Sequence, residues 1–431
     1  MVVQNSIMIN SHGKDKMVIV GGTPLVGHVT VSGGKNSAVA IITGTILCDE
    51  PCTIDNLPDI EDVHALIAIL EHLGAKVTYV PDEYLTVDPT TITSYTVPYK
   101  YSSRLRASYY FMGALLGRCL KAKVSYPGGC DIGARPIDQH LKSFAALGAN
   151  VDDVAGMINI SADNLVGGDI FFDFVTVGAT MNVMLAAVKA VGSTVIYNAA
   201  KEPHIVDLAN FLNSMGAKIK GAGTDTIRIK GVSSLKSTNY SVIPDQIETG
   251  TLMIMAAATR GDVTIHGCIP KHMESLSAKL LEMGNIITEN GDSIRVRPRT
   301  ELRAINLKTQ VYPGFPTDLQ QPMTALLCMA KGTSTVEETV FEQRFKHLEE
   351  MRRMGIKYKL IDQTVIIHGV NELYGAPVTV TDLRAGAALI VAGLMAKGET
   401  EIYETIYIDR GYERIEEKLC SLGANIRREQ I

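Results

Sequence analysis

One five-residue phrase recurs six times along this chain of 431 residues. The copies are LGAKV at 73–77, LGANV at 147–151, MGAKI at 215–219, MGNII at 283–287, MGIKY at 354–358 and LGANI at 422–426. Their glycines are 74, 68, 68, 71 and 68 residues apart. This regularity indicates six similar units of about 70 residues. Because the chain is too long for one ordinary core, the units are predicted to form two domains of three.

Two series of helices alternate along these units. In the first series, apolar residues recur at helical spacing before each phrase, and in 205–216 Ile205, Leu208 and Leu212 share one face. Glycine then ends the helix, and a segment rich in β-formers follows. The second series is apolar on nearly every side and begins at Ser37, Arg106, Thr180, Thr249, Thr317 and Asp382. We therefore expect buried core helices surrounded by sheets and amphipathic helices.

Composition excludes several classes of function. With 41 basic and 46 acidic residues the formal charge is −5, which argues against non-specific nucleic-acid binding but allows a pocket for a small anion. The seven cysteines include no CxxC pair, and the ten histidines include no HxH or HExxH pair, so no disulfide framework and no metal site is expected. No stretch is long and apolar enough for a signal or membrane helix, so we expect a cytoplasmic protein without membrane insertion.

The run PGGCDIGARP at 127–136 holds one thiol among glycines. Gly128, Gly129 and Gly133 around Cys130 predict an exposed loop that a ligand can reach. Most free cysteines are small inert hydrophobes, and this structural explanation stays open for an isolated thiol.

Charged and polar residues gather where helices begin. Lys35 and Asn36, Arg106, Thr176 to Gly178, Asp318 and Arg384 stand at the starts of buried helices, and Arg135, Arg344 and Arg410 precede amphipathic ones. A helix start carries unpaired N–H groups and partial positive charge, so added cations there favour a bound anion. Taken singly, Asp318 is explained as a helix cap, and Arg344 and Arg384 as solvated charges. Their equivalent places in a repeat favour one shared anionic ligand.

Ten motifs together resemble a known family. They are SGGKNSA (32–38), RLRASYY (104–110), PGGCDIGARPIDQH (127–140), VGAT (177–180), EPHIVDLANFL (202–212), PDQIETGT (244–251), PGFPTDLQ (313–320), FEQRFKHLEEMRRMG (341–355), TDLRAGAAL (381–389) and IDRGYERIEEKL (408–419). From about Lys16 onward the chain resembles the UDP-N-acetylglucosamine 1-carboxyvinyltransferases, the enolpyruvyl transferases that begin peptidoglycan synthesis.

The resemblance implies an α/β fold of two inside-out barrel domains, each of three βαβαββ units, with a cleft that closes on substrate. We expect a polar extension over 1–15, a first domain over 35–243, and a second domain made of 16–34 together with 244–431. On pattern alone, 16–34 could pair with either half. The implied reaction moves the enolpyruvyl group of phosphoenolpyruvate to the 3′-hydroxyl of UDP-N-acetylglucosamine and releases phosphate. It needs no cofactor, and the implied inhibitor is fosfomycin.

The resemblance also implies roles for individual residues. Cys130 matches the thiol that protonates C-3, forms a phospholactoyl adduct and is alkylated by fosfomycin, and Asp318 matches the residue on the sugar hydroxyl that is the usual base candidate. The implied phosphoenolpyruvate ligands are Lys35, Asn36, Cys130, Arg135, Arg344, Arg384 and Arg410, of which Lys35 and Arg410 are also expected to be catalytic. The implied nucleotide-sugar contacts are Asn36, Arg106, Arg135, Pro136, Ile137, Asp138, Gln139, Thr176, Val177, Gly178, Asp318 and Val340.

Two alternative functions fit the sequence less well. The shikimate-pathway enolpyruvyl transferases are similar in fold and donor chemistry but lack the cysteine loop. A non-catalytic nucleotide-sugar sensor derived from the enzyme would have lost a chemical residue, and none is lost here. Asp131 beside the thiol would raise its pKa and Arg135 would lower it, so the sequence leaves open whether Cys130 is an obligatory acid or mainly a covalent trap.

Overall fold

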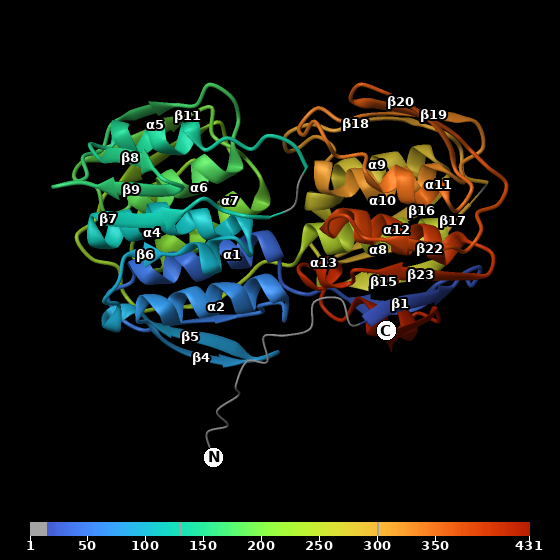
Figure 1. Cartoon of the computed structure of the whole chain (residues 1–431), viewed down its shortest axis with the longest axis horizontal. Helices are drawn as coiled ribbons and strands as arrows, with labels where there is room; N and C mark the ends of the chain where they lie inside the picture. The colour runs from blue at the N-terminus through green and yellow to red at the C-terminus, as the bar shows by residue number, and fades with distance from the viewer. Residues whose placement is uncertain (1–14, 130–131, 300) are drawn as a thin grey trace, which may run out of the picture.

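The computed structural model describes residues 15–129, 132–299 and 301–431, and Figure 1 shows them as two lobes side by side. The first lobe has a hydrophobic core drawn from Ala38 to Val242. The core of the second lobe is drawn from Met17 to Val31 and from Ile247 to Ile426. The domain boundaries given above stay a prediction, and the expected extension over 1–15 lies outside the described residues except for Asp15, where β1 begins.

The described residues form six four-stranded sheets that repeat one topology. One unit contains β6 (Thr96–Val97), α4 (Tyr110–Cys119), β7 (Lys121–Ser125), α5 (Asp138–Ala146), β8 (Asn150–Val154) and β9 (Met157–Ser161). Its strand order is β6-β7-β9-β8, with β6 parallel to β7 and the other two pairs antiparallel. This arrangement is the βαβαββ unit, so the predicted α/β class with six repeats is confirmed.

The other units of the first lobe are built in the same way. One has β14 (Asn239–Ser241), α1 (Lys35–Gly44), β3 (Cys52–Asp55), α2 (Glu61–Leu73), β4 (Lys76–Val80) and β5 (Tyr84–Asp88). The other has β10 (Asp169–Phe171), α6 (Val177–Ala187), β11 (Ser193–Tyr197), α7 (Pro203–Ser214), β12 (Lys218–Lys220) and β13 (Thr226–Lys230). Short helical turns between these elements are η1 (Thr45–Leu47), η2 (Pro89–Thr91), α3 (Tyr99–Ser102) and η3 (Arg106–Tyr109).

The second lobe takes two strands from the start of the chain. Its first unit has β2 (Val26–Thr30), α8 (Gln246–Ala258), β15 (Asp262–His266), η4 (Pro270–Met273), α9 (Glu274–Glu282), β16 (Asn285–Asn290) and β17 (Ser293–Pro298). The next has β18 (Asn306–Lys308), η5 (Thr317–Leu319), α10 (Gln320–Leu327), β19 (Thr333–Glu337), α11 (His347–Arg352), β20 (Lys357–Ile361) and β21 (Thr364–His368). The last has β22 (Pro377–Thr379), α12 (Leu383–Met395), β23 (Glu399–Tyr403), α13 (Ile406–Asp409), α14 (Ile415–Ser421), β24 (Asn425–Gln430) and β1 (Asp15–Val20).

The glycine of the repeated phrase ends the outer helix in every unit. All six of these glycines have a φ between 88° and 103°, the left-handed region that a side chain disfavours. The expected helix ends are therefore confirmed. The inner helices are buried on all sides, as in α12, where every residue from Leu383 to Leu394 is buried. In each lobe three such helices, α1, α4 and α6 or α8, α10 and α12, pack behind the sheets.

The chain crosses between the lobes twice, and the two crossings lie together. The Gly34 N–H donates to the Ile243 carbonyl at 2.7 Å, and the Asp245 N–H donates to the Ser32 carbonyl at 2.9 Å. Gly33 has no room for a side chain, because a Cβ there would lie 1.7 Å from the Asn56 carbonyl oxygen. The crossings thus form one compact hinge region.

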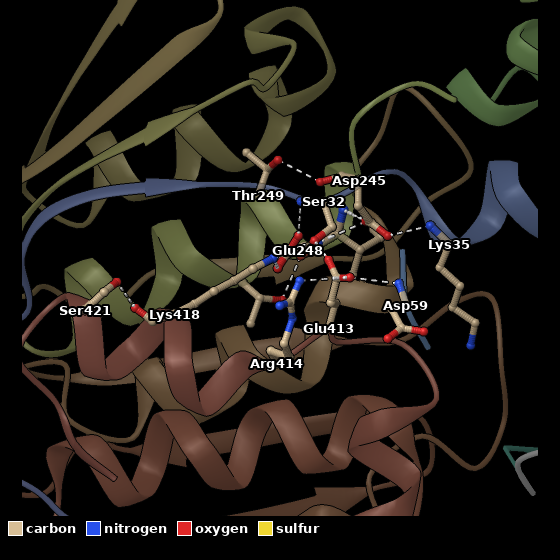
Figure 2. Close-up of polar contacts among 12 residues, drawn as sticks. Ser32, Lys35, Asp59, Asp245, Glu248, Thr249, Glu413, Arg414, Lys418 and Ser421 are labelled. Atoms are coloured by element: carbon tan, nitrogen blue, oxygen red, sulfur yellow. Dashed lines mark hydrogen bonds and ion pairs between the residues drawn. The ribbon is translucent and has the colours of Figure 1, made fainter. Parts of the chain in front are cut away.

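Figure 2 shows the polar contacts around this hinge. Glu248 on α8 accepts hydrogen bonds from Lys418 and from the Ser32 N–H, and Glu413 accepts one from the Asp59 N–H at 2.9 Å. The last bond joins the loop before α14 in the second lobe to the loop before α2 in the first. The Glu413 carboxylate of the second lobe is therefore anchored by a backbone group of the first lobe.

Candidate active site

A cavity of about 670 Å³ lies where the starts of the helices of both lobes face one another. Its volume is within the ordinary range for a small-molecule site. Six cations line it: Lys35, Arg106, Arg135, Arg344, Arg384 and Arg410. The structure thus brings together the cations that the sequence pattern places at separate helix starts.

The local structure explains how those cations reach the cavity. Lys35 is the first residue of α1, and its N–H donates to the Asp245 carboxylate at 2.9 Å. Arg384 follows Asp382, whose carboxylate caps α12 by accepting the Arg384 and Ala385 N–H groups. Arg135, Arg344 and Arg410 lie in the loops before α5, α11 and α14. Because each unit points the start of its helices the same way, the repeat concentrates positive charge at one place.

One pair of cations holds Asp62, the second residue of α2. Asp62 Oδ2 lies 2.8 Å from Lys35 Nζ, and Asp62 Oδ1 accepts from Arg410 Nε at 2.9 Å. The Asp62 side chain is only 7% exposed. Burial alone would raise its pKa, but Lys35 and Arg410 outweigh burial and lower the pKa of Asp62 below its ordinary value. Asp62, Lys35 and Arg410 are called the Asp62 triad below.

A second pair holds Asp318 in the turn η5. Arg344 Nη2 donates to Asp318 Oδ1 at 2.6 Å, and Arg384 Nη2 donates to Asp318 Oδ2 at 3.0 Å. Although burial works to raise the pKa of Asp318, Arg384 and Arg344 hold that pKa well below its ordinary value. The Asp318 side chain keeps 25% of its surface exposed, so a ligand in the cavity can reach it. These three residues are called the Asp318 triad.

Most of the expected nucleotide-sugar contacts also line the cavity. They are Asn36, Arg106, Arg135, Pro136, Thr176, Val177, Gly178, Asp318 and Val340. Gly178 stands where a Cβ would lie 2.5 Å from the Tyr109 hydroxyl, so no larger residue fits there without movement. Thr176 caps α6 and leaves the start of that helix facing the cavity.

Three expected contacts lie beside the cavity instead. Ile137 is buried, Asp138 is the first residue of α5, and Gln139 is buried with its amide donating to Asp138 and Asp173 at 2.9 Å. The cavity lining does not include them. Their contact with a nucleotide sugar stays a prediction.

The expected thiol, Cys130, and its neighbour Asp131 lie outside the described residues. The residues on either side of them do line the cavity, among them Gly129, Ile132 and Ala134. The Ile132 carbonyl accepts from the Gln343 N–H of the second lobe at 3.2 Å. This loop of the first lobe therefore meets the second lobe at the rim of the site.

Several lining residues are not among the site residues predicted from the sequence. They include Asp62, Glu202, His140, His204 and His272. His140 is 4% exposed, and burial, helped by Arg106, lowers its pKa to about 3. The acid pair Glu61-Asp62 in the first turn of α2 looks like ordinary charge complementarity at a helix start. The EPHIVD run at 202–207 offered the better signal, since it opens a helix with a glutamate and a histidine.

Comparison with known proteins identifies the family. The model of a family described as EPSP synthase (3-phosphoshikimate 1-carboxyvinyltransferase) matches residues 19–419. The UDP-N-acetylglucosamine 1-carboxyvinyltransferase of Clostridium botulinum is 56% identical over 412 residues, which cover 95% of this chain and 99% of that protein. This chain belongs to the UDP-N-acetylglucosamine 1-carboxyvinyltransferase family.

Other members of the UDP-N-acetylglucosamine 1-carboxyvinyltransferase family are nearly as similar. UDP-N-acetylglucosamine 1-carboxyvinyltransferase 3 of Caldanaerobacter subterraneus is 54% identical, with 96% of this chain and 99% of that protein covered. Among solved structures, the enolpyruvyl transferase NikO from Streptomyces tendae superposes with a TM-score of 0.88 at 26% identity, covering 97% of this chain and all of that one. An EPSP synthase from Acinetobacter baumannii, with a TM-score of 0.74 at 18% identity over the same share of this chain, agrees in fold alone.

Neither a membrane-spanning helix nor a cluster of metal ligands occurs in the described part of the chain. Within residues 15–129, 132–299 and 301–431, no helix is long and apolar enough to cross a membrane. In the same ranges, no three His, Cys, Asp or Glu side chains gather closely enough to hold a metal ion.

Proposed function

We propose that this protein transfers the enolpyruvyl group of phosphoenolpyruvate to the 3′-hydroxyl of UDP-N-acetylglucosamine. The hydroxyl oxygen bonds to C-2 while a proton is added at C-3, and the resulting tetrahedral ketal then loses phosphate and the C-3 proton. This is the first committed step of peptidoglycan synthesis, and a cytoplasmic location fits a nucleotide-sugar substrate. The observation that carries the proposal is the cationic cavity between the lobes of a chain 56% identical to an enzyme of that name.

The five cations Lys35, Arg135, Arg344, Arg384 and Arg410 are assigned to phosphoenolpyruvate, with Asn36 beside them. Arginine pairs with planar carboxylate and phosphate oxygens through two N–H groups, whereas lysine acts as a point charge. Four of the five already hold an aspartate, two in each triad. Such cations suit an anionic substrate, because an arginine can turn one N–H group toward it and keep the other on the aspartate.

Asp318 is assigned as the base that takes the proton of the sugar hydroxyl. Its low pKa makes it ionised but weakly basic at neutral pH. When Arg344 and Arg384 turn toward a bound anion, they stabilise the carboxylate less and the pKa of Asp318 rises. We therefore expect phosphoenolpyruvate to make Asp318 a stronger base once the cleft has closed and excluded water.

Cys130 is assigned as the proton donor to C-3 and as the nucleophile that forms the covalent phospholactoyl adduct. An ordinary thiol, with a pKa near ~8.5, is mostly protonated at neutral pH and can donate first and attack later. Fosfomycin would alkylate this sulfur by opening its epoxide ring. Gly129 has a φ of 110° and Gly133 a φ of 121°, values that side chains disfavour, so glycine is required at these two positions near the thiol.

UDP-N-acetylglucosamine is assigned mainly to the first-lobe side of the cavity, with Asp318 and Val340 of the second lobe facing it. The start of α6, with Thr176, Val177 and Gly178, offers backbone N–H groups and partial positive charge to the diphosphate, next to Arg106. The remaining assigned contacts are Asn36, Arg135, Pro136, Ile137, Asp138, Gln139, Asp318 and Val340.

The test is phosphate release from phosphoenolpyruvate with either UDP-N-acetylglucosamine or shikimate 3-phosphate as the acceptor, each with and without fosfomycin. Release that requires UDP-N-acetylglucosamine and stops with fosfomycin supports the proposal. Release only with shikimate 3-phosphate would overturn it. A Cys130→Ser enzyme is expected to resist fosfomycin, and a variant that stays fully sensitive would contradict the role of Cys130.

A further inference from the structure

Glu338 is a fully buried acid that does not line the cavity. It follows β19 and leads into the loop that carries Val340 and Phe341 to the cavity wall. A carboxylate buried in this way requires hydrogen-bond donors to compensate for the loss of water. The identity of those donors indicates what Glu338 does.

Each oxygen of Glu338 accepts from a different part of the second lobe. Oε1 accepts from the Thr309 hydroxyl at 2.8 Å, from the Val340 N–H at 2.9 Å and from the Phe341 N–H at 3.3 Å. Oε2 accepts from the Thr317 hydroxyl at 2.8 Å. All four partners donate, as is typical of a carboxylate.

The Thr317 hydroxyl extends this contact to the Asp318 triad. Thr317 Oγ1 donates its single proton to Glu338, so its lone pairs are free to accept from Arg344 Nη1 at 2.8 Å. The other guanidinium nitrogen, Arg344 Nη2, donates to Asp318. Glu338 therefore fixes the direction of a hydroxyl that holds one arm of the Arg344 fork.

The backbone contacts of Glu338 reach the same guanidinium from another side. The Phe341 ring lies against Arg344, with 5.2 Å between the guanidinium carbon and the ring centroid. Because Glu338 accepts from the Phe341 N–H, it also fixes the backbone position from which the Phe341 side chain extends. One buried carboxylate thus stabilises both the hydrogen-bonding and the aromatic partner of Arg344.

We infer that Glu338 is a positioning residue, which orients Arg344 through the Thr317 hydroxyl and the 340–341 backbone and so sets the geometry of the Asp318 triad. The inference rests on the proposed function, because it predicts the kinetics of that reaction. Glu338 itself does not line the cavity, whereas Thr317 does, so the role assigned to Glu338 acts through its neighbours. Small misplacements of catalytic groups are known to cost large factors in rate.

Three variants separate positioning from simple structural support. Thr317→Val removes the hydroxyl but keeps the side-chain shape, Thr317→Ser keeps the hydroxyl, and Thr309→Val removes a bond to Glu338 on the side away from Arg344. The measurements are kcat, KM for phosphoenolpyruvate and thermal unfolding. Glu338→Gln is a fourth variant, and the threonine variants test the inference even where Glu338→Gln does not fold.

Thr317→Val is expected to lower kcat/KM for phosphoenolpyruvate by about 10- to 100-fold, whereas Thr317→Ser stays within about threefold of the unsubstituted enzyme. Thr309→Val is expected to lower Tm at least as much as Thr317→Val, because Thr309 also accepts from the Thr339 N–H, yet to keep kcat/KM within about threefold. Equal kinetic losses in Thr317→Val and Thr309→Val would overturn the inference. If the unsubstituted enzyme itself releases no phosphate with UDP-N-acetylglucosamine, the proposed function fails instead.

Discussion

The Asp62 and Asp318 triads each place one aspartate between two cations, but they connect different parts of the molecule. Asp62 and Lys35 belong to elements of the first lobe, and Arg410 belongs to the second. All three members of the Asp318 triad belong to the second lobe. The first triad therefore depends on how the lobes sit together, whereas packing within one lobe sets the second.

Exposure separates the two triads further. The Asp62 side chain is 7% exposed and the Asp318 side chain 25% exposed. Both carboxylates line the cavity, but the more exposed Asp318 is better placed to meet a ligand, and the more buried Asp62 is better suited to hold its two cations in place. Two ion triads with the same arrangement of charges can thus serve different purposes within one cavity.

The largest expected effect comes from making Asp318 neutral. Asp318→Asn removes the assigned base and leaves Arg344 and Arg384 without their anion, so kcat is expected to fall by about 10³-fold. The measurement is steady-state phosphate release together with KM for both substrates. A fall in kcat of less than tenfold would show that another group takes the proton.

Asp62→Asn is expected to act mainly on stability. It leaves two partly exposed cations, with side chains 12% and 14% exposed, next to each other, which costs about 3 kcal/mol of unfolding free energy. Added phosphate or phosphoenolpyruvate should restore part of the lost Tm by supplying the missing anion. The measurements are urea unfolding and thermal unfolding with and without those anions.

Lys142→Ala is the matched control for Asp62→Asn. The Lys142–Asp173 ion pair has side chains that are 57% and 58% exposed, so solvent screens it and its loss should leave the unfolding free energy nearly unchanged. If Asp62→Asn is as mild as Lys142→Ala, the Asp62 triad does not hold the lobes together.

A further effect is expected on acid stability. His347 is fully buried, and burial is the main reason that its pKa falls to about 4. The unfolded chain binds a proton at His347 near the ordinary histidine pKa of ~6.5, whereas the folded chain does not. His347 therefore lowers the unfolding free energy as the pH falls from about 6.5 to 4. The aspartates of the triads have lowered pKa values, so their stabilising contribution is present above about pH 4 and is lost only below it.

Replacement of His347 therefore isolates one part of the acid response. In His347→Gln the slope of unfolding free energy against pH should fall by up to about 1.4 kcal/mol per pH unit between pH 6 and 4.5. Urea unfolding at a series of pH values measures that slope. An unchanged slope would contradict the buried neutral state of His347.

Much of the fold could be predicted because its repeat is local in the sequence. Each repeated glycine ends its own helix, and a left-handed glycine needs no distant partner to do so. The inner helices can be predicted equally well, since a helix without a polar face must be buried. The pairing of β1 between β23 and β24 could not be predicted, because residues about 400 positions apart set that register.

The candidate site could be predicted where charge breaks a local rule. Arg384 and Lys35 stand at helix starts, where a cation is unfavourable without an anion, so their positions alone were informative. Asp62 could not be predicted, because an acid at a helix start is favourable and so looks ordinary. Its partner Arg410 lies 348 positions away in the sequence. Glu338 gave none either, because four donors that converge on one carboxylate are visible only in three dimensions.

The two crossings between the lobes have a consequence for how the protein is made. Strands β1 and β2 leave the ribosome first, yet their sheets are completed by residues that follow Asp245, the last of them β24 at the end of the chain. At ~5–20 residues per second, β1 waits roughly 20–80 s for β24 while the first lobe can already fold. We expect this interval to be when the nascent chain most needs a chaperone, and a chain truncated before β24 to lack a finished second lobe.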